Sequence, residues 1–193
     1  MLAVDSLGKR YGSRWVFRRI SFQLGIGDRL AVLGSNGSGK STLLKVISGL
    51  AMATEGSVSF AEGDLRCFLG FCGIEQALYP HLSVEEHLEL AAELRGCDSR
   101  TDELLDKIGL AFARGQQSIQ LSTGMKSRLR LALAIQAEPK LLLLDEPGAS
   151  LDESGRALIE QIADEQAKRG CLIFATNDPG ERRLANLELK LED

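Results

Sequence analysis

The sequence predicts an α/β fold in which parallel strands form a sheet covered by helices on both faces. Continuous apolar runs predict this sheet, because such runs are typical of strands buried on both faces. They lie at Arg29–Leu33, Lys140–Leu144 and Cys171–Ala175. Helical patterns alternate with these runs, which favours parallel strands joined by helical crossovers. The helices predicted in this part of the chain are 40–48, 121–137 and 154–169.

The N-terminal part is predicted to be rich in β-structure. Leu2–Leu7 and Trp15–Phe22 have the residue types of short strands, and they flank a turn at Gly12. Residues 56–60 and 67–71 have similar patterns. We therefore expect a β-rich beginning of the chain, before the α/β core.

A helical insertion is predicted in the middle of the chain. Ser83 and Glu86 form a capping-box pattern that opens a helix over Val84–Leu94, and a second helix follows at Thr101–Ile108. At 193 residues the chain fits one domain. We expect this single domain, 1–193, to consist of a helical subdomain at about 77–120, and of a β-subdomain and core formed by 1–76 and 121–193.

Composition excludes some classes of function. Hydrophobic residues make up 44% and charged residues 26%, and the net charge of −4 argues against a general affinity for nucleic acid. No apolar run approaches the roughly 18 to 20 residues that span a bilayer. The start, Met1–Asp5, lacks the basic and apolar pattern of a secretion signal. We expect a cytoplasmic protein that reaches a membrane only through another chain.

A phosphate-binding loop is the strongest local motif. Gly34–Ser41 matches G-x-x-x-x-G-K-[ST] and lies between a predicted strand and a predicted helix. Backbone N–H groups of such a loop, together with the helix N-terminus, surround phosphate oxygens. Lys40 adds a positive charge for the β- and γ-phosphates, and Ser41 offers a hydroxyl to Mg²⁺. The residues predicted to bind the nucleotide here are Gly34, Ser35, Asn36, Gly37, Ser38, Gly39, Lys40, Ser41 and Thr42.

Two acidic residues follow the apolar run that ends at Leu144. Asp145 is predicted to hold Mg²⁺, and Glu146 to orient and deprotonate the water that attacks ATP. The alternative is a strand that simply emerges into solvent. The phosphate loop upstream favours the catalytic interpretation.

The segment Leu121–Met125, followed by a helix from Lys126, resembles the signature motif of ABC ATPases. The resemblance covers essentially the whole chain. It implies a P-loop NTPase core with an N-terminal antiparallel β-subdomain and a small helical insertion. It also implies that two such domains pair head to tail around ATP and Mg²⁺, each signature facing the other's phosphate loop. The signature residues are Leu121, Ser122, Thr123, Gly124 and Met125; for Ser122 a plain helix N-cap is the alternative.

The resemblance assigns roles to three further segments. Tyr11 is similar to the aromatic residue that stacks on adenine, although a strand-end residue of a small core is the alternative. Ala149–Asp152 resembles the D-loop that contacts the partner ATPase. Leu78–Glu85 resembles the segment on which a transmembrane subunit docks; a solvated loop is the alternative.

The sequence departs from the family at two positions. Asn177 stands where the family has a histidine that contacts the γ-phosphate; an amide donates a hydrogen bond but carries no charge. Ile74 stands where a metal-contacting glutamine is usual, so Gln76 or Glu75 takes that role after a slip of one or two residues. Gln76 is the predicted metal contact, with Glu75 left open.

The function predicted is the ATP-binding and hydrolysing subunit of an ABC transporter, of an exporter-like short form, working with a second ATPase domain and a transmembrane subunit. The catalytic residues predicted are Lys40, Glu146 and Asn177. One alternative is a soluble ABC ATPase, for example in cluster assembly. Another is an ATP-binding switch with impaired hydrolysis, which Asn177 motivates.

Overall fold

The computed structural model describes residues 2–61, 68–73 and 75–191. Ile74 and the start of the strand predicted at 67–71 therefore lie outside the described residues. The strands are β1 Leu2–Tyr11, β2 Arg14–Leu24, β3 Arg29–Leu33, β4 Glu55–Phe60, β5 Leu69–Cys72, β6 Leu141–Asp145, β7 Cys171–Ala175 and β8 Leu187–Lys190. The helices are α1 Lys40–Ile47, α2 Val84–Arg95, α3 Thr101–Lys107, α4 Thr123–Ile135, α5 Glu153–Arg169 and α6 Pro179–Arg182.

Two sheets organise the described part of the chain. One is parallel, with the strand order β5-β6-β7-β3-β8, and the other is antiparallel, with the order β2-β1-β4. The neighbours β6, β7 and β3 are thus the fully flanked strands of the parallel sheet, which explains their continuous apolar sequences. The α/β class and the antiparallel N-terminal layer predicted from the sequence are confirmed.

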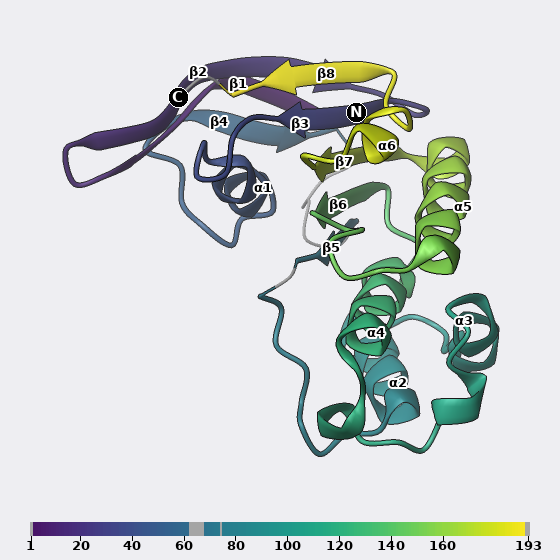
Figure 1. The fold of residues 1–193 in the computed structure, drawn as a ribbon. Coiled ribbons are helices and arrows are strands. Elements are labelled where there is room, and N and C mark those ends of the chain that lie inside the picture. Colours follow the sequence, from purple (N-terminus) through teal and green to yellow (C-terminus); the bar gives the residue numbers. More distant parts are fainter. Residues whose placement is uncertain (1, 62–67, 74, 192–193) are drawn as a thin grey trace.

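The parallel sheet carries a hydrophobic core on each face. One core joins residues such as Leu143 and Ile173 to helix α1 and to the antiparallel sheet. The other joins Leu142, Leu144 and Phe174 to α4 and α5 and continues into α2 and α3. Figure 1 shows α2 and α3 at the end of the molecule away from the antiparallel sheet.

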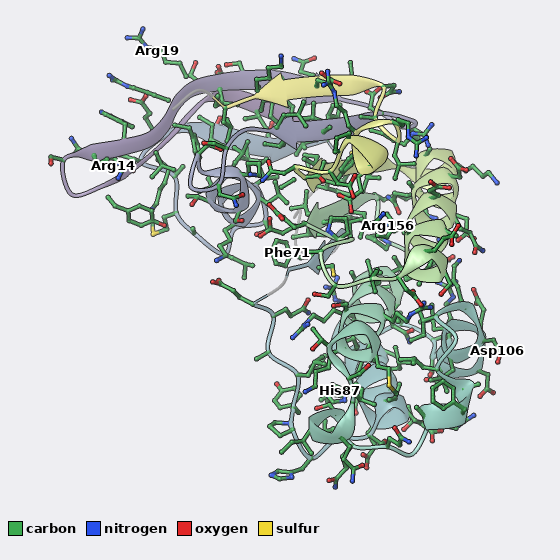
Figure 2. The ribbon with its side chains drawn as sticks, viewed as in Figure 1. Arg14, Arg19, Phe71, His87, Asp106 and Arg156 are labelled. Carbon is green, nitrogen blue, oxygen red and sulfur yellow. The ribbon has the colours of Figure 1, made fainter. Side chains whose placement is uncertain are left out.

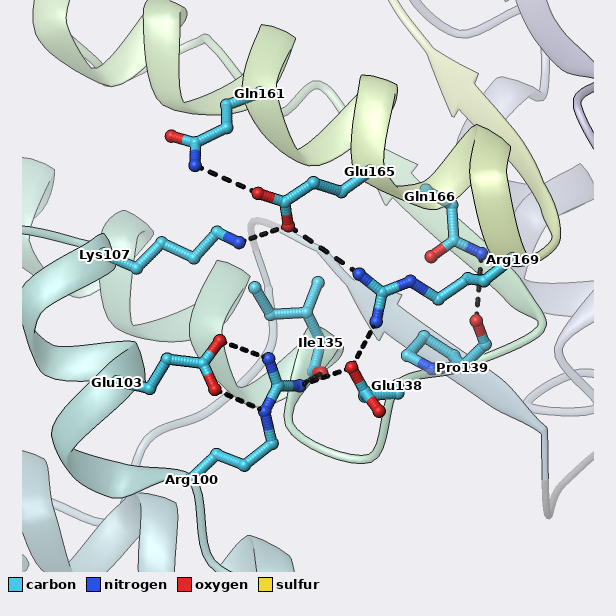
Figure 3. A network of polar contacts seen from close by, with 10 residues as sticks. All are labelled: Arg100, Glu103, Lys107, Ile135, Glu138, Pro139, Gln161, Glu165, Gln166 and Arg169. Carbon is cyan, nitrogen blue, oxygen red and sulfur yellow. Dashed lines mark hydrogen bonds and ion pairs between the residues drawn. The ribbon is translucent and has the colours of Figure 1, made fainter.

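Polar contacts also connect α3 to the core. Arg100 contacts Glu138, whose carboxylate also accepts from Arg169 at 2.7 Å. Lys107 on α3 forms an ion pair with Glu165 of α5. Figure 3 shows these side chains meeting between α3, α5 and the end of α4. Partly buried ion pairs hold helices in a defined geometry better than isolated exposed pairs do. Solvent screens their attraction less, and ordering their side chains costs less entropy.

Most predicted elements are present, with differences at their ends. The Ser83–Glu86 capping box is confirmed, with both reciprocal hydrogen bonds formed. The helix predicted at 121–137 is shorter at both ends, because Ser122 is the N-cap of α4 and Gln136 its C-cap. Strand β8 and helix α6 were not predicted. The β8 sequence Leu-Glu-Leu-Lys is short, charged and largely exposed, so it lacks the apolar run of the other parallel strands.

Candidate nucleotide-binding site

The carboxyl ends of β3, β6 and β7 bring three separate segments to one edge of the parallel sheet. Val32 pairs with Ala175, and Ala175 also pairs with Asp145. The phosphate loop follows β3, Asp145 and Glu146 close β6, and Asn177 follows β7. Ligands of open α/β sheets bind outside the carboxyl ends of the strands. The sheet order therefore brings the predicted site residues together.

The phosphate loop ends at the N-terminus of α1. Gly39 is the N-cap with φ of 101°, and a Cβ there would come within 2.4 Å of Val16 Cγ1. Only glycine meets both conditions without strain. Ser38 is buried, and its hydroxyl makes no hydrogen bond with any described residue. The loop thus presents backbone N–H groups and an uncommitted hydroxyl at a helix N-terminus, which is suited to an anion.

Lys40 is the central cation of this edge. Its ammonium donates to the carbonyls of Gly34 at 2.9 Å and Ser35 at 3.1 Å, and lies 3.7 Å from a carboxylate oxygen of Glu146. The residue is only 5% exposed. The ammonium is therefore held in a fixed place inside the loop.

Ser41 and Asp145 form an oxygen pair beside Lys40. The Ser41 hydroxyl donates to Asp145 Oδ1 at 2.9 Å. Burial raises the pKa of Asp145, while the Ser41 hydrogen bond and the charges of Lys45 and Lys40 oppose that rise. Hydroxyl and carboxylate oxygens are the donors that Mg²⁺ takes when substrate phosphates complete its coordination. The two residues fit a magnesium site of that kind.

Glu146 has a left-handed backbone. Its φ is 48°, and its N–H donates to Ala175 O at 2.9 Å on the neighbouring strand. Non-glycine residues seldom adopt this conformation, and such strain gathers at functional sites. The turn directs a partly exposed carboxylate toward Lys40.

Asn177 lies opposite the phosphate loop. Its side-chain amide donates to Asn36 Oδ1 at 2.6 Å. A contact between residues 141 positions apart means that the segment after β7 reaches the tip of the loop. The predicted γ-phosphate contact is therefore at the edge where a nucleotide would end.

Most of the phosphate loop, from Asn36 to Thr42, lines an open cleft of about 790 Å³ together with Asp145 and Glu146, whereas Asn177 is not among the cleft residues. Besides the phosphate loop, Asp145 and Glu146, it is bordered by Tyr11, Arg14, Trp15, Val16, Lys45 and Glu75. Tyr11 was predicted from the sequence, whereas its neighbours in the β1–β2 hairpin were not. The guanidinium groups of Arg10 and Arg18 lie 5.5 Å and 4.4 Å from the centre of the Trp15 ring. Figure 2 shows Arg14 near the tip of that hairpin.

Two residues after β5, Glu75 and Gln76, are candidates for the predicted metal contact. Glu75 lines the cleft and accepts from Lys45 Nζ at 2.8 Å. This pairing raises the pKa of Lys45, and the nearby charge of Asp145 raises it further. Gln76 is not among the cleft residues, and its side-chain oxygen is buried without a partner in the described part of the chain. The geometry thus brings Glu75 rather than Gln76 to the cleft.

The signature segment lies outside the cleft of its own chain. Leu121 is buried, and the Ser122 hydroxyl accepts from the N–H of Met125 at 3.2 Å, as an N-cap does. Thr123 and Gly124 form the first turn of α4. Arg128, one turn further, pairs with Asp152 at 2.8 Å and so ties α4 to the segment predicted to be the D-loop.

A phosphate loop, an acidic strand end and an intervening cleft at the carboxyl edge of a parallel sheet define a nucleotide-binding domain of the P-loop class. Residues 17–149 match the family model described as ABC transporter. The chain belongs to this family, as an ATP-binding domain.

Individual relatives agree with this assignment. The chain is 33% identical over 183 residues to a lantibiotic transport ATP-binding protein of Streptococcus pyogenes, covering 92% of this chain and 80% of the relative. A solved ATP-binding subunit of an ABC transporter superposes with a TM-score of 0.89 at 28% identity, over 99% of this chain and 85% of that one. A putative metal-chelate type ABC transporter, solved in an inward-facing conformation, gives a TM-score of 0.80 at 28% identity, over 99% and 79%.

Proposed function

We propose that this chain is the subunit of an ABC transporter that binds and hydrolyses ATP, with the energy delivered to a separate membrane subunit. The observation that carries the proposal is the convergence of Lys40, Asp145 and Glu146 at one end of the cleft. A cation, a metal-binding oxygen pair and a carboxylate base are the groups that phosphoryl transfer to water needs.

Each residue has a proposed task. The loop 34–42 binds the phosphates, and Tyr11 and Trp15 provide aromatic surface for the base in the same cleft. Ser41 and Asp145 would hold Mg²⁺, which neutralises charge on the phosphates, with Glu75 in the same cleft. Glu146 orients the attacking water and accepts its proton. Asn177 donates a hydrogen bond to the γ-phosphate.

The signature residues complete the site of a second copy. Ser122 and Gly124 lie at the N-terminus of α4, where N–H groups and the helix dipole attract anions. Because they lie outside their own cleft, we propose that they contact nucleotide held by the partner's phosphate loop.

The remaining assignments follow from the family. We propose that residues 77–120 act as a helical subdomain whose 78–85 segment contacts a transmembrane subunit. Among the described residues, no helix is both long and apolar enough to cross a bilayer. From the family assignment, we place the protein on the cytoplasmic side of the membrane, held there by a membrane partner. The Leu-Ser-Thr-Gly-Met signature favours an exporter-type system.

Replacing Glu146 with glutamine tests the proposed function directly. The isosteric amide keeps the turn but cannot accept a proton, so ATP turnover should fall by about 100-fold or more, as general bases contribute that much. ATP binding should persist and hold two chains together. Analytical ultracentrifugation with ATP and Mg²⁺ should then show dimer for this variant and less dimer for the wild type. Monomer alone at saturating ATP would refute the paired arrangement.

Asn177 should limit the rate of hydrolysis. A histidine at this position can donate a hydrogen bond as a cation, and charge-assisted hydrogen bonds are stronger than neutral ones. Asn177→His should therefore raise kcat by about 10-fold, an increment of about 1.4 kcal/mol. Asn177→Ala should lower kcat with little change in KM. If wild-type protein binds ATP but shows no turnover, and Asn177→His restores it, the chain is an ATP-binding switch.

A further inference from the structure

A buried carboxylate lies behind the cleft and has no role in the functions proposed above. Glu181 on α6 is 7% exposed, and it does not line the cleft. Burial raises the pKa of this carboxyl, and the neighbouring charges of Asp178 and Glu146 raise it further. Burying an acid beside two others is unfavourable unless hydrogen bonds compensate.

Two groups from different strand ends lie against Glu181. The hydroxyl of Thr176 and the backbone N–H of Gly148 both act on its carboxyl and oppose the rise in its pKa. Thr176 itself is 2% exposed, and its N–H donates to Val32 O on β3 at 3.2 Å. One side chain thus links the segments that follow β6 and β7, next to the strand that precedes the phosphate loop.

Gly148 fits closely against this carboxylate. A Cβ at position 148 would lie 2.2 Å from Glu181 Oε1, closer than any contact allows. Gly148 also lies within the turn closed by the hydrogen bond from Ala149 N to Glu146 O, at 3.2 Å. Holding Gly148 therefore restrains the strained backbone of Glu146. On the other side, Thr176 immediately precedes Asn177.

We propose, resting on the ATPase function above, that Glu181 is a positioning residue for hydrolysis. Its side chain contacts Gly148 and Thr176 at once, and so fixes the separation between Glu146 and Asn177. A shift of Asn177 is thereby passed to the turn after Glu146 and on to Ala149–Asp152. Glu181 acts through these segments and touches no nucleotide.

Substitution of Glu181 with alanine should lower kcat without weakening ATP binding. Removing the carboxylate in Glu181→Ala frees the two segments that carry Glu146 and Asn177. A misplacement of catalytic groups by about 1 Å can lower the rate by up to about 100-fold. We expect kcat to fall about 10-fold or more, with Kd for ATP unchanged within about 3-fold. Glu181→Gln can accept from Gly148 and donate to Thr176, so it should retain kcat within about 3-fold of wild type. The exposed Glu160→Ala on α5 is the matched control and should match wild type in both.

Gly148→Ala gives an independent approach if Glu181→Ala does not fold. The added methyl displaces the carboxylate, so kcat should fall as in Glu181→Ala. The double variant Gly148→Ala/Glu181→Ala should be no slower than the slower single variant, because both changes break one linkage. Three results would each overturn the proposal. They are additive losses of kcat in the double variant, a loss of kcat in Glu181→Gln as large as that in Glu181→Ala, and an unchanged kcat in Gly148→Ala. A wild type that binds but never hydrolyses ATP would instead contradict the ATPase function.

Discussion

Lys40→Ala is expected to lose ATP binding. The Lys40 ammonium is held inside the phosphate loop by the carbonyls of Gly34 and Ser35, and it is the most deeply buried cation bordering the cleft. Truncating one partner of a buried, hydrogen-bonded charge pair costs about 2 kcal/mol or more, which is about 30-fold in Kd. Isothermal titration with ATP and Mg²⁺ should show this loss, and ATP turnover should be undetectable.

The control for Lys40 is Lys168, an exposed lysine on α5. Lys168→Ala changes the net charge by the same amount as Lys40→Ala. Because Lys168 lies on α5 and not in the phosphate loop, this variant should leave Kd for ATP unchanged. If both variants bound ATP more weakly by the same factor, the loss of affinity would come from the change in overall charge. Unchanged binding in Lys40→Ala would remove the phosphate loop as the nucleotide site.

The parts of this site that follow one another in the chain could be predicted from sequence. Gly34–Ser41 combines glycines, a lysine and a hydroxyl at fixed spacing, so the loop, its helix and its ligand class follow from local chemistry. Asp145 and Glu146 end a run of four leucines, and the sheet order places them beside that loop. Alternation of strands and helices was enough to predict that neighbourhood.

The parts that depend on contacts between distant segments could not be predicted. Trp15 borders the cleft only because the β1–β2 hairpin extends beside the phosphate loop, and neither its strand pattern nor its neighbours indicate that. Glu181 lies in a short polar stretch that also holds Asp178 and two arginines, a pattern that in sequence is typical of a solvated face. Its burial follows from Gly148, which lies 33 positions away and leaves room for the carboxylate. The choice between Glu75 and Gln76 likewise depended on which side chain faces the cleft.

Gly124→Asp is expected to abolish turnover without preventing folding. An acidic residue in the first turn of α4 interacts favourably with the helix dipole, and the nearest atom to a new Cβ is Ser150 O at 3.4 Å, which is an ordinary contact. A carboxylate there repels a phosphate presented by another chain. ATP turnover should fall by about 100-fold, comparable to the loss of one oxyanion-stabilising group, while Kd of the monomer for ATP should stay the same.

Mixing Gly124→Asp with Lys40→Ala should restore activity that neither variant has alone. In a mixed pair, one composite site has both defects and the other combines an intact phosphate loop with an intact signature from the partner. Random two-fold assortment then gives up to about a quarter of wild-type turnover per chain. A signature that served its own chain's nucleotide would leave every pair defective. Steady-state ATPase assays of the separate variants and of the equimolar mixture distinguish these cases. An inactive mixture would contradict the proposal that the signature serves the partner's nucleotide, and an active Gly124→Asp variant by itself would place Gly124 in a purely structural role.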